Sequence, residues 1–290
     1  MEQIIELKNV QEAVNLARTF KEQGKYVFFR GQFNSTWNVV SSLARWQHLE
    51  KDEDNYNRRI MRFYEFCKKT AELAYLCEKE HVDELVAIMQ HYGIPTHYID
   101  FTRDPSIAAF FASDGENAVS GQYSSIVCLE QKDIDIIDQI SREVNIVGNL
   151  QSPENSLLEI EVTHLWRLQA QQGIFLFMPF SNFEESYSYA LDRIVFPTAG
   201  IVQSPLRNEI YPSRKSPLES LLDHYFDNEQ KLINNKRIKE WFSELQKKHP
   251  ATTSYMEAKD NLSSMKDYLK KEAKPCQSWM DANIKIWQQS

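Results

Sequence analysis

Glycine is scarce in this sequence, with 8 residues among 290, and no stretch of the chain is of low complexity. Linker-dominated and repetitive proteins are richer in glycine and proline, so those classes are excluded. No window offers the roughly 20 apolar residues of a membrane span. The first ten residues lack the basic and apolar regions of a signal peptide. We therefore expect a cytoplasmic protein without a membrane partner.

Positive charge is also in short supply, because 33 Lys and Arg face 41 Asp and Glu and leave a formal net charge of −8. Proteins that coat nucleic acid are usually basic, so we expect nucleic acid only as a modified target. Four cysteines, Cys67, Cys77, Cys128 and Cys276, form no CxxC pair and are interpreted as buried free thiols. No spacing of His, Cys or acidic residues predicts a metal site.

Aromatic side chains are abundant, with 16 Phe, 13 Tyr and 6 Trp, and they predict a sizeable core. Apolar periodicity predicts helices over residues 9–24, 53–80, 82–92 and 105–112, and strands over 26–29, 97–101, 123–130, 157–162, 174–178 and 194–196. Short strands between helices of uneven length, without repeated βαβ spacing, predict an α+β fold. We expect small mixed or antiparallel sheets with flanking helices.

The composition changes at the boundary between residues 1–227 and residues 228–290. The first range is interpreted as the α+β domain. The second is charged and poor in strand formers, so we expect a helical C-terminal extension. Such helices are most often a solvated cover on a core. The sharper alternative is a protein partner that docks on Trp241, Trp279 and Trp287, since aromatic residues are favoured interface anchors.

Arg30 follows an apolar strand, which would direct its five-donor guanidinium group at a phosphate or carboxylate. Gly31 permits the close approach of a backbone or a ligand, and Gln32 adds a neutral donor and acceptor. The alternative is structural: Arg30 pairs with a buried acid such as Asp100. The sequence leaves both interpretations open.

A second group of polar residues lies in residues 90–102, where a helix end, a turn and a strand follow one another. Asp100 and Thr102 would share one side of the strand. Asp104 and Pro105 then predict a helix start, whose free amides favour anions. The candidate ligand-binding residues here are Gln90, His91, Tyr92, Thr96 and Asp100, with Thr102 beside them. The alternative is that His91 caps its own helix and that Asp100 only neutralises Arg30.

The third group runs from Arg167 to Phe175. Its glutamines, Gln171 among them, precede a glycine and an aromatic strand, and they could bond a base or a ribose. The alternative is an ordinary helix C-cap with solvated glutamines.

Taken in order, these three segments resemble the FRG domain, a family named after its Phe/Tyr-Arg-Gly motif. The resemblance rests on residues 29–32, on residues 90–96 with 100–102, and on residues 167–175, and it extends from about residue 8 to about residue 226. Family members more often have arginine and leucine where this chain has His97 and Tyr98.

The resemblance implies similarity to the ADP-ribosyltransferase superfamily and a part in bacterial conflict, as a toxin or a phage-defence effector. NAD would be the co-substrate or, as a related nucleotide, the ligand. Arg30 would hold it, Asp100 and Thr102 would support the nicotinamide ribose, and Gln171 would act near the ribosyl carbon. Arg30, Thr102 and Gln171 are therefore the candidate catalytic residues, and Arg167 is a candidate ligand-binding residue.

One part of the expected machinery is missing, because no glutamate stands beside Gln171. Glu209 and Glu219 are substitutes that nothing in the sequence favours. The alternative function is therefore a non-catalytic module that senses a nucleotide and acts through a partner.

Overall fold

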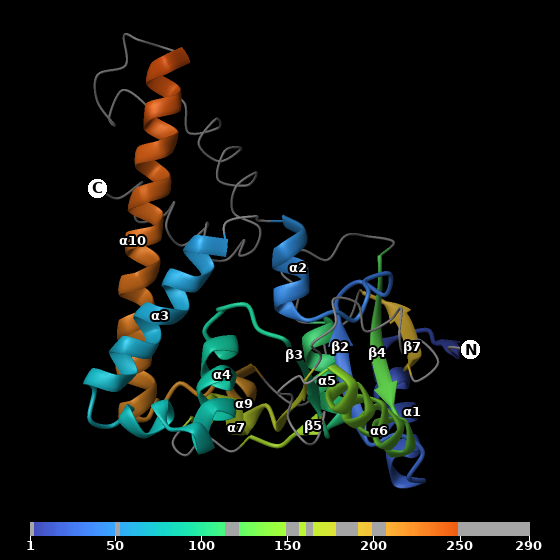
Figure 1. Ribbon diagram of the computed structural model, residues 1–290. Helices are drawn as coiled ribbons and strands as arrows, with labels where there is room; N and C mark the ends of the chain where they lie inside the picture. The colour runs from blue at the N-terminus through green and yellow to red at the C-terminus, as the bar shows by residue number, and fades with distance from the viewer. Residues whose placement is uncertain are drawn as a thin grey trace. The chain divides into compact units, whose positions relative to one another are not determined.

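The computed structural model describes residues 3–49, 53–113, 122–148, 157–160, 165–177, 191–198 and 207–248 (Figure 1). The chain divides into two compact units, residues 1–220 and residues 221–290. The boundary expected after residue 227 lies within helix α10 (Pro217–Lys248), which is continuous across it. No described helix is both long and apolar enough to cross a membrane.

Within the described residues of the first unit, seven strands form one sheet in the order β1-β7-β4-β2-β3-β6-β5. The strands are β1 (Ile4–Glu6), β2 (Phe28–Gln32), β3 (Tyr98–Thr102), β4 (Tyr123–Leu129), β5 (Leu157–Leu158), β6 (Gly173–Phe177) and β7 (Leu191–Pro197). Neighbours are antiparallel except β1 and β7, which are parallel. The fold is α+β with a mixed sheet, as expected, but the strands form one sheet where several small ones were predicted.

The helices of the first unit are α1 (Val10–Glu22), α2 (Ser42–Leu49), α3 (Glu53–Lys69), α4 (Val82–His91), α5 (Pro105–Ser113), α6 (Gln131–Gly148), α7 (Trp166–Ala170) and α9 (Arg207–Ile210). Helix α1 begins as predicted, because Asn9 Oδ1 accepts the backbone N–H of Glu12 at 2.9 Å. It ends before Gly24, whose φ of +70° suits glycine.

The helix predicted over residues 53–80 is shorter than expected. Helix α3 ends at Lys69, and two 3₁₀ turns follow at Ala74–Cys77 and Lys79–His81. Thr70 explains the break, because its hydroxyl donates to the carbonyl of Phe66 at 2.8 Å. Its backbone N–H donates to Cys67 at 3.1 Å, three residues back, which tightens the last turn.

The two faces of the sheet carry separate cores, because side chains alternate along each strand. The α1–α5 face packs on helices α1 and α5; its buried residues include Ala13, Ala17, Phe29, Ala108, Ala112, Ile126, Cys128, Ile194 and Phe196. The opposite face has its own buried group, which includes Phe28, Val39, Ile99, Phe101, Val127, Leu129, Ile174, Leu176 and Leu191. Adjacent residues of β2 therefore serve different cores.

Gly31 is required by the packing of α5 on β2. A Cβ atom at this position would lie 1.9 Å from the carbonyl oxygen of Ala108 and 2.7 Å from the backbone nitrogen of Ala112. Helix α5 therefore rests directly on the strand backbone. Arg30 is the central residue of β2, where the sequence predicted that the strand ends, because Gly31 and Gln32 still pair with Ile126 and Ser125 of β4.

Candidate functional site

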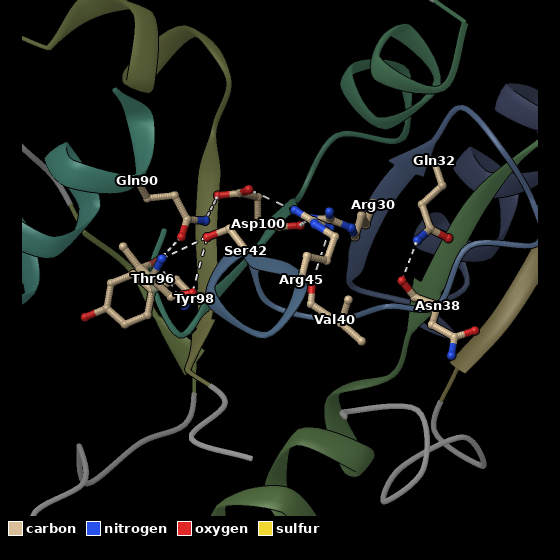
Figure 2. A network of polar contacts seen from close by, with 10 residues as sticks. All are labelled: Arg30, Gln32, Asn38, Val40, Ser42, Arg45, Gln90, Thr96, Tyr98 and Asp100. Atoms are coloured by element: carbon tan, nitrogen blue, oxygen red, sulfur yellow. Dashed lines mark hydrogen bonds and ion pairs between the residues drawn. The ribbon is translucent and has the colours of Figure 1, made fainter. Parts of the chain in front are cut away.

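Arg30 bridges β2 and β3 at the point where their pairing stops. The register pair between these strands is Phe29 with Thr102. One step further along β2, the Arg30 Nη1 atom donates to the main-chain carbonyl of Asp100 at 2.7 Å and lies 3.8 Å from its Oδ2 atom (Figure 2). The Arg30 side chain therefore supplies to the Asp100 carbonyl the hydrogen bond that a backbone N–H would supply in a continuous strand pair. Asp100 is 59 % exposed, so the acid beside Arg30 is not the buried one expected.

Arg45 of helix α2 joins this pair. Figure 2 shows its guanidinium group beside that of Arg30, near Asp100. Burial lowers the pKa of Arg30, Asp100 opposes this shift, and the positive charge of Arg45 adds to it. The surrounding protein partly desolvates Arg45, although its side chain keeps an exposed surface, and this lowers its pKa, again against the effect of Asp100. Two arginines therefore share one half-exposed carboxylate, and the site is locally positive in a chain of net charge −8.

Asp100 is held in place by a chain of polar contacts that runs to helix α2. Gln90 Nε2 donates to Asp100 Oδ1 at 2.5 Å, and the Thr96 hydroxyl donates to Gln90 Oε1. The backbone N–H of Thr96 donates to the Ser42 hydroxyl at 2.9 Å, and Ser42 is the first residue of α2 (Figure 2). The same network therefore orients the acid and fixes the helix that carries Arg45.

Four of the predicted residues thus come together: Arg30, Gln90, Thr96 and Asp100. Arg45 was missed, because no helix was predicted between residues 30 and 52. An arginine one turn into helix α2 was the available signal. His91 is instead the last residue of α4 and Tyr92 is its C-cap. Their rings lie 5.2 Å apart, and the Tyr92 hydroxyl donates to the carbonyl of Glu219 at 3.4 Å.

Thr102 is buried and shapes the start of helix α5. Its hydroxyl oxygen accepts the backbone N–H of Asp104 at 3.2 Å, and Asp104 Oδ1 accepts that of Ser106 at 2.8 Å. The predicted N-cap at Asp104 is confirmed. A carboxylate already lies at this helix start, so the free amides expected to attract an anion are partly satisfied.

Gln171 is the C-cap of helix α7, which is the structural alternative stated above, and its backbone N–H donates to Arg167 at 3.2 Å. The next residue, Gln172, has a φ of +45°, a conformation that is uncommon outside glycine. Gly173 then pairs with Thr102, so Gln171 lies two residues before that register pair. The guanidinium carbon of Arg167 lies 5.4 Å from the ring centre of Tyr211.

Glu219 is a capping-box glutamate. Its two carboxylate oxygens accept the backbone N–H groups of Arg167 at 2.8 Å and Ser216 at 2.9 Å. Its own N–H donates to the Ser216 hydroxyl at 3.0 Å, which closes the box at the start of α10. Glu219 therefore has a structural task. The Ser-Pro-Leu-Glu run of residues 216–219 was the signal that the sequence interpretation missed.

Cys67 and Cys128 are buried free thiols, and Cys77 is free and half-buried. Burial, with a smaller effect of Cys77, raises the pKa of Cys67 to about 12. Cys276 lies outside the described residues. Among the residues that the structure describes, no group of three His, Cys, Asp or Glu could hold a metal ion.

Residues 25–120 match the family model of the FRG domain. This part of the chain is an FRG domain. No curated protein and no solved structure matches the chain. The matched segment contains the Arg30 site with Arg45, Gln90 and Asp100, whereas Arg167 and Gln171 lie beyond it.

Each of the three residues of the FRG motif, Phe29, Arg30 and Gly31, has a different structural role. Phe29 is fully buried among the side chains of the α1–α5 face. Arg30 bridges to Asp100, and Gly31 admits helix α5. Packing thus explains the first and third positions, and only the arginine is left to contact a ligand.

Proposed function

We propose that the FRG domain binds a nucleotide of the NAD class through its phosphate groups, with Arg30 and Arg45 as the phosphate-binding residues. The observation that carries this proposal is that two guanidinium groups share a single, half-exposed carboxylate. Guanidinium donors match phosphate oxygens in geometry and charge. A phosphate at Arg30 and Arg45 would supply the negative charge that Asp100 alone does not.

The two arginines keep donors for such a ligand. Arg30 uses Nη1 for Asp100, while its buried Nε atom has no hydrogen-bond partner among the described residues. Arg45 is exposed and donates to the carbonyl of Val40 over a long 3.3 Å. Because Asp100 is held by Gln90, the arginines are oriented before a ligand arrives, which reduces the entropic cost of binding.

The choice of NAD rests on the likeness to ADP-ribosyltransferases that the motifs imply. The order of the sheet supports it. Strands β2, β3 and β6 are neighbours in the sheet. Arg30 lies on β2, Thr102 lies on β3, and Gln171 lies two residues before β6. These candidate residues, each more than 60 residues from the next in the sequence, therefore come from neighbouring strands of the sheet.

Binding without turnover is the mode that the geometry favours, so we propose a nucleotide-sensing module. The hydroxyl oxygen of Thr102 is buried and accepts a backbone N–H. Both oxygens of Glu219 are occupied, so it supplies no ribose-orienting carboxylate. Gln171 offers an amide, which can orient a ribose but activates an acceptor less well than a carboxylate does.

An NAD-consuming enzyme is the second candidate, as a transferase or glycohydrolase acting in bacterial conflict or phage defence. The neighbouring strands of Arg30, Thr102 and Gln171 favour it. The side chains of Arg30 and Thr102 lie on different faces of the sheet, since Thr102 pairs with Phe29. Nicotinamide would leave with the electron pair of the glycosidic bond, and water or an acceptor would add to the oxocarbenium-like centre and release a proton. Nearby dipoles would stabilise that centre.

The test of binding uses the full-length protein and titrations with NAD, ADP-ribose and nicotinamide mononucleotide. We expect NAD to raise the Tm and to bind at least tenfold more weakly to Arg45→Ala, because one of two phosphate partners is lost. Arg58→Ala is the matched control, an exposed arginine on α3. If none of the nucleotides raises the Tm, the proposal fails.

Free nicotinamide separates the two candidates. The protein is incubated with NAD, with and without cell extract, beside an Arg30→Ala variant that still melts cooperatively. Nicotinamide release that needs Arg30 establishes the enzyme, and its dependence on extract distinguishes a transferase from a glycohydrolase. Binding without release leaves the sensing module, whose partner we propose to dock on residues 228–290.

A further inference from the structure

Four polar residues gather on the opposite face of the sheet, across three neighbouring strands. Arg30 of β2 faces Val127 of β4, which faces Arg193 of β7, and Gln32 faces Ser125 one pleat further on. Pairing between β2 and β4 is continuous from residue 28 to residue 32, so the alternation of side chains is unbroken. Arg30, Gln32, Ser125 and Arg193 therefore share the face that also carries Phe28 and Leu129.

Arg193 and Gln32 meet across the intervening strand. Arg193 Nη1 donates to Gln32 Oε1 at 2.5 Å, although β4 lies between their strands. The arginine side chain therefore extends over β4, on the side that Ser125 occupies. The Gln32 amide nitrogen donates over a long 3.5 Å to the carbonyl of Asn38. These residues are deeply buried: Gln32 is 4 % exposed, Ser125 0 % and Arg193 6 %.

Two hydrogen-bonding atoms on this face have no partner. Among the described residues, three buried side-chain atoms lack a hydrogen bond, and Arg30 Nε and Ser125 Oγ are two of them. A buried polar atom without a partner is costly, so such atoms call for an explanation. The groups gathered here are mainly donors: two guanidinium groups, a hydroxyl and an amide. An excess of donors with positive charge suits an anion and excludes a cation.

We infer that Arg30 Nε, Gln32, Ser125 and Arg193 form a phosphate subsite, and that the ligand is a pyrophosphate-bearing nucleotide. Arg30 belongs both to the outer site with Asp100 and to this subsite, because its Nη1 atom lies at Asp100 and its Nε atom lies nearer the strand. One phosphate contacts Arg30 and Arg45, and the directly linked one contacts Ser125 and Arg193. This inference rests on the proposed function for the outer phosphate, and it adds the residues that would hold the second phosphate of the pyrophosphate group. Arg30 is the more exposed member, so the subsite adjoins the surface there.

Ser125→Ala tests the subsite, and Ser124→Ala is its matched control. Ser124 is the preceding residue on β4 and faces the other side, where its hydroxyl contacts the carbonyl of Phe33 at 3.0 Å and the hydroxyl of Thr198 at 3.1 Å. We expect Ser125→Ala to weaken binding of inorganic pyrophosphate about tenfold at unchanged or higher stability. Ser124→Ala should lower stability and leave the affinity as it is. The affinities are measured by calorimetry on the full-length protein.

Gln32→Glu is a second variant that does not depend on the small change at Ser125. It keeps the shape of the side chain and places a carboxylate against Arg193. We expect it to fold and to lose pyrophosphate binding, because the new charge repels the anion. Unchanged pyrophosphate affinity in either Ser125→Ala or Gln32→Glu overturns the subsite.

The nucleotide titrations distinguish this inference from the proposed function. If pyrophosphate binds in a Ser125-dependent way while NAD and ADP-ribose do not bind, the subsite stands and the NAD proposal falls. If NAD binding depends on Arg45 and not on Ser125, the proposed function stands and the subsite falls. If the wild-type protein binds none of the probes, both are overturned.

Discussion

The two faces of strands β2, β4 and β7 differ in how completely their polar groups are satisfied. On the α1–α5 face, small and apolar residues pack closely, and the one buried hydroxyl on β4, that of Ser124, has two partners. On the opposite face, the apolar residues give way to Arg30, Gln32, Ser125 and Arg193, and two of their polar atoms have no hydrogen-bond partner in the part of the chain that the structure describes. The same strands therefore hold the fold together with one face and offer unmet donors with the other.

This difference explains how one short motif can serve two purposes. Because side chains alternate, Phe29 and Gly31 face the helices, while Arg30 between them faces the other way. A substitution on the α1–α5 face should change stability alone. A substitution on the opposite face should change ligand affinity, and it should change stability only where it breaks an existing contact such as that of Gln32 with Arg193. The following predictions test how far that separation holds.

Gly31→Ala should have the largest effect. The added Cβ would lie 1.9 Å from a backbone oxygen of α5, which cannot move as a flexible side chain can. We expect a loss above the ~1–3 kcal/mol that overpacking usually costs, measured by urea unfolding. Gly24→Ala is the control: no atom of the described residues lies within 4 Å of its added Cβ, but its φ of +70° is unfavourable for alanine, so about 1 kcal/mol is expected. Equal losses in the two variants would contradict the close packing of α5.

Gln32→Leu should come next, with a loss of about 2 kcal/mol, because it removes an acceptor from the buried Arg193. The double variant Gln32→Leu with Arg193→Met removes both partners. We expect it to lose less stability than the sum of the two single variants, with a coupling of about 1 kcal/mol. Strictly additive losses in urea unfolding would show that the two side chains are not coupled.

Ser124→Ala and Ser125→Ala should change the free energy of unfolding by different amounts or with different signs, although the two residues are adjacent. Ser124→Ala breaks satisfied hydrogen bonds and should cost about 1 kcal/mol. Ser125→Ala removes an unpartnered hydroxyl, so the free energy of unfolding should stay the same or rise. A larger loss at Ser125 than at Ser124 would show that the Ser125 hydroxyl does make a stabilising hydrogen bond, against its assignment as unpartnered among the described residues.

The smallest effect is expected for thiol alkylation at pH 8. Burial raises the pKa of Cys67 to about 12 and raises that of Cys128 as well, so almost no reactive thiolate is present in the folded protein. Mass spectrometry should find both unmodified until the protein unfolds, with Cys77 as the more exposed comparison. The same shifts make stability fall as the pH rises above about 8.5, because the unfolded thiols then ionise first. Rapid labelling of Cys128 would contradict its burial.

Features that depend on a few neighbouring residues could be predicted from the sequence. The helix starts at Asn9 and Asp104 are confirmed, because each depends on a few neighbouring residues. Strand β1 was missed. It has only three residues, Ile4 among them, and its pairing partner is far along the chain.

The candidate site was predictable in part for the same reason. Gln90, Thr96 and Asp100 stand close together in the sequence, and the pairing of Arg30 with Asp100 was one of two stated alternatives. Ser125 and Arg193 were not found. They meet Arg30 only through the register of β2, β4 and β7, and no local pattern encodes a register between segments so far apart.

The pairing of β1 with β7 has a consequence for the order of events during synthesis. The backbone N–H of Gln3 donates to the Asp192 side chain, a contact that spans 189 residues of chain. At about 5–20 residues per second, the ribosome needs roughly 10–40 s to reach the second partner after making the first. During that interval β1 has no strand to pair with, and the nascent sheet ends at an open edge beside β4. The emergence of β7 is therefore the step that closes this side of the sheet.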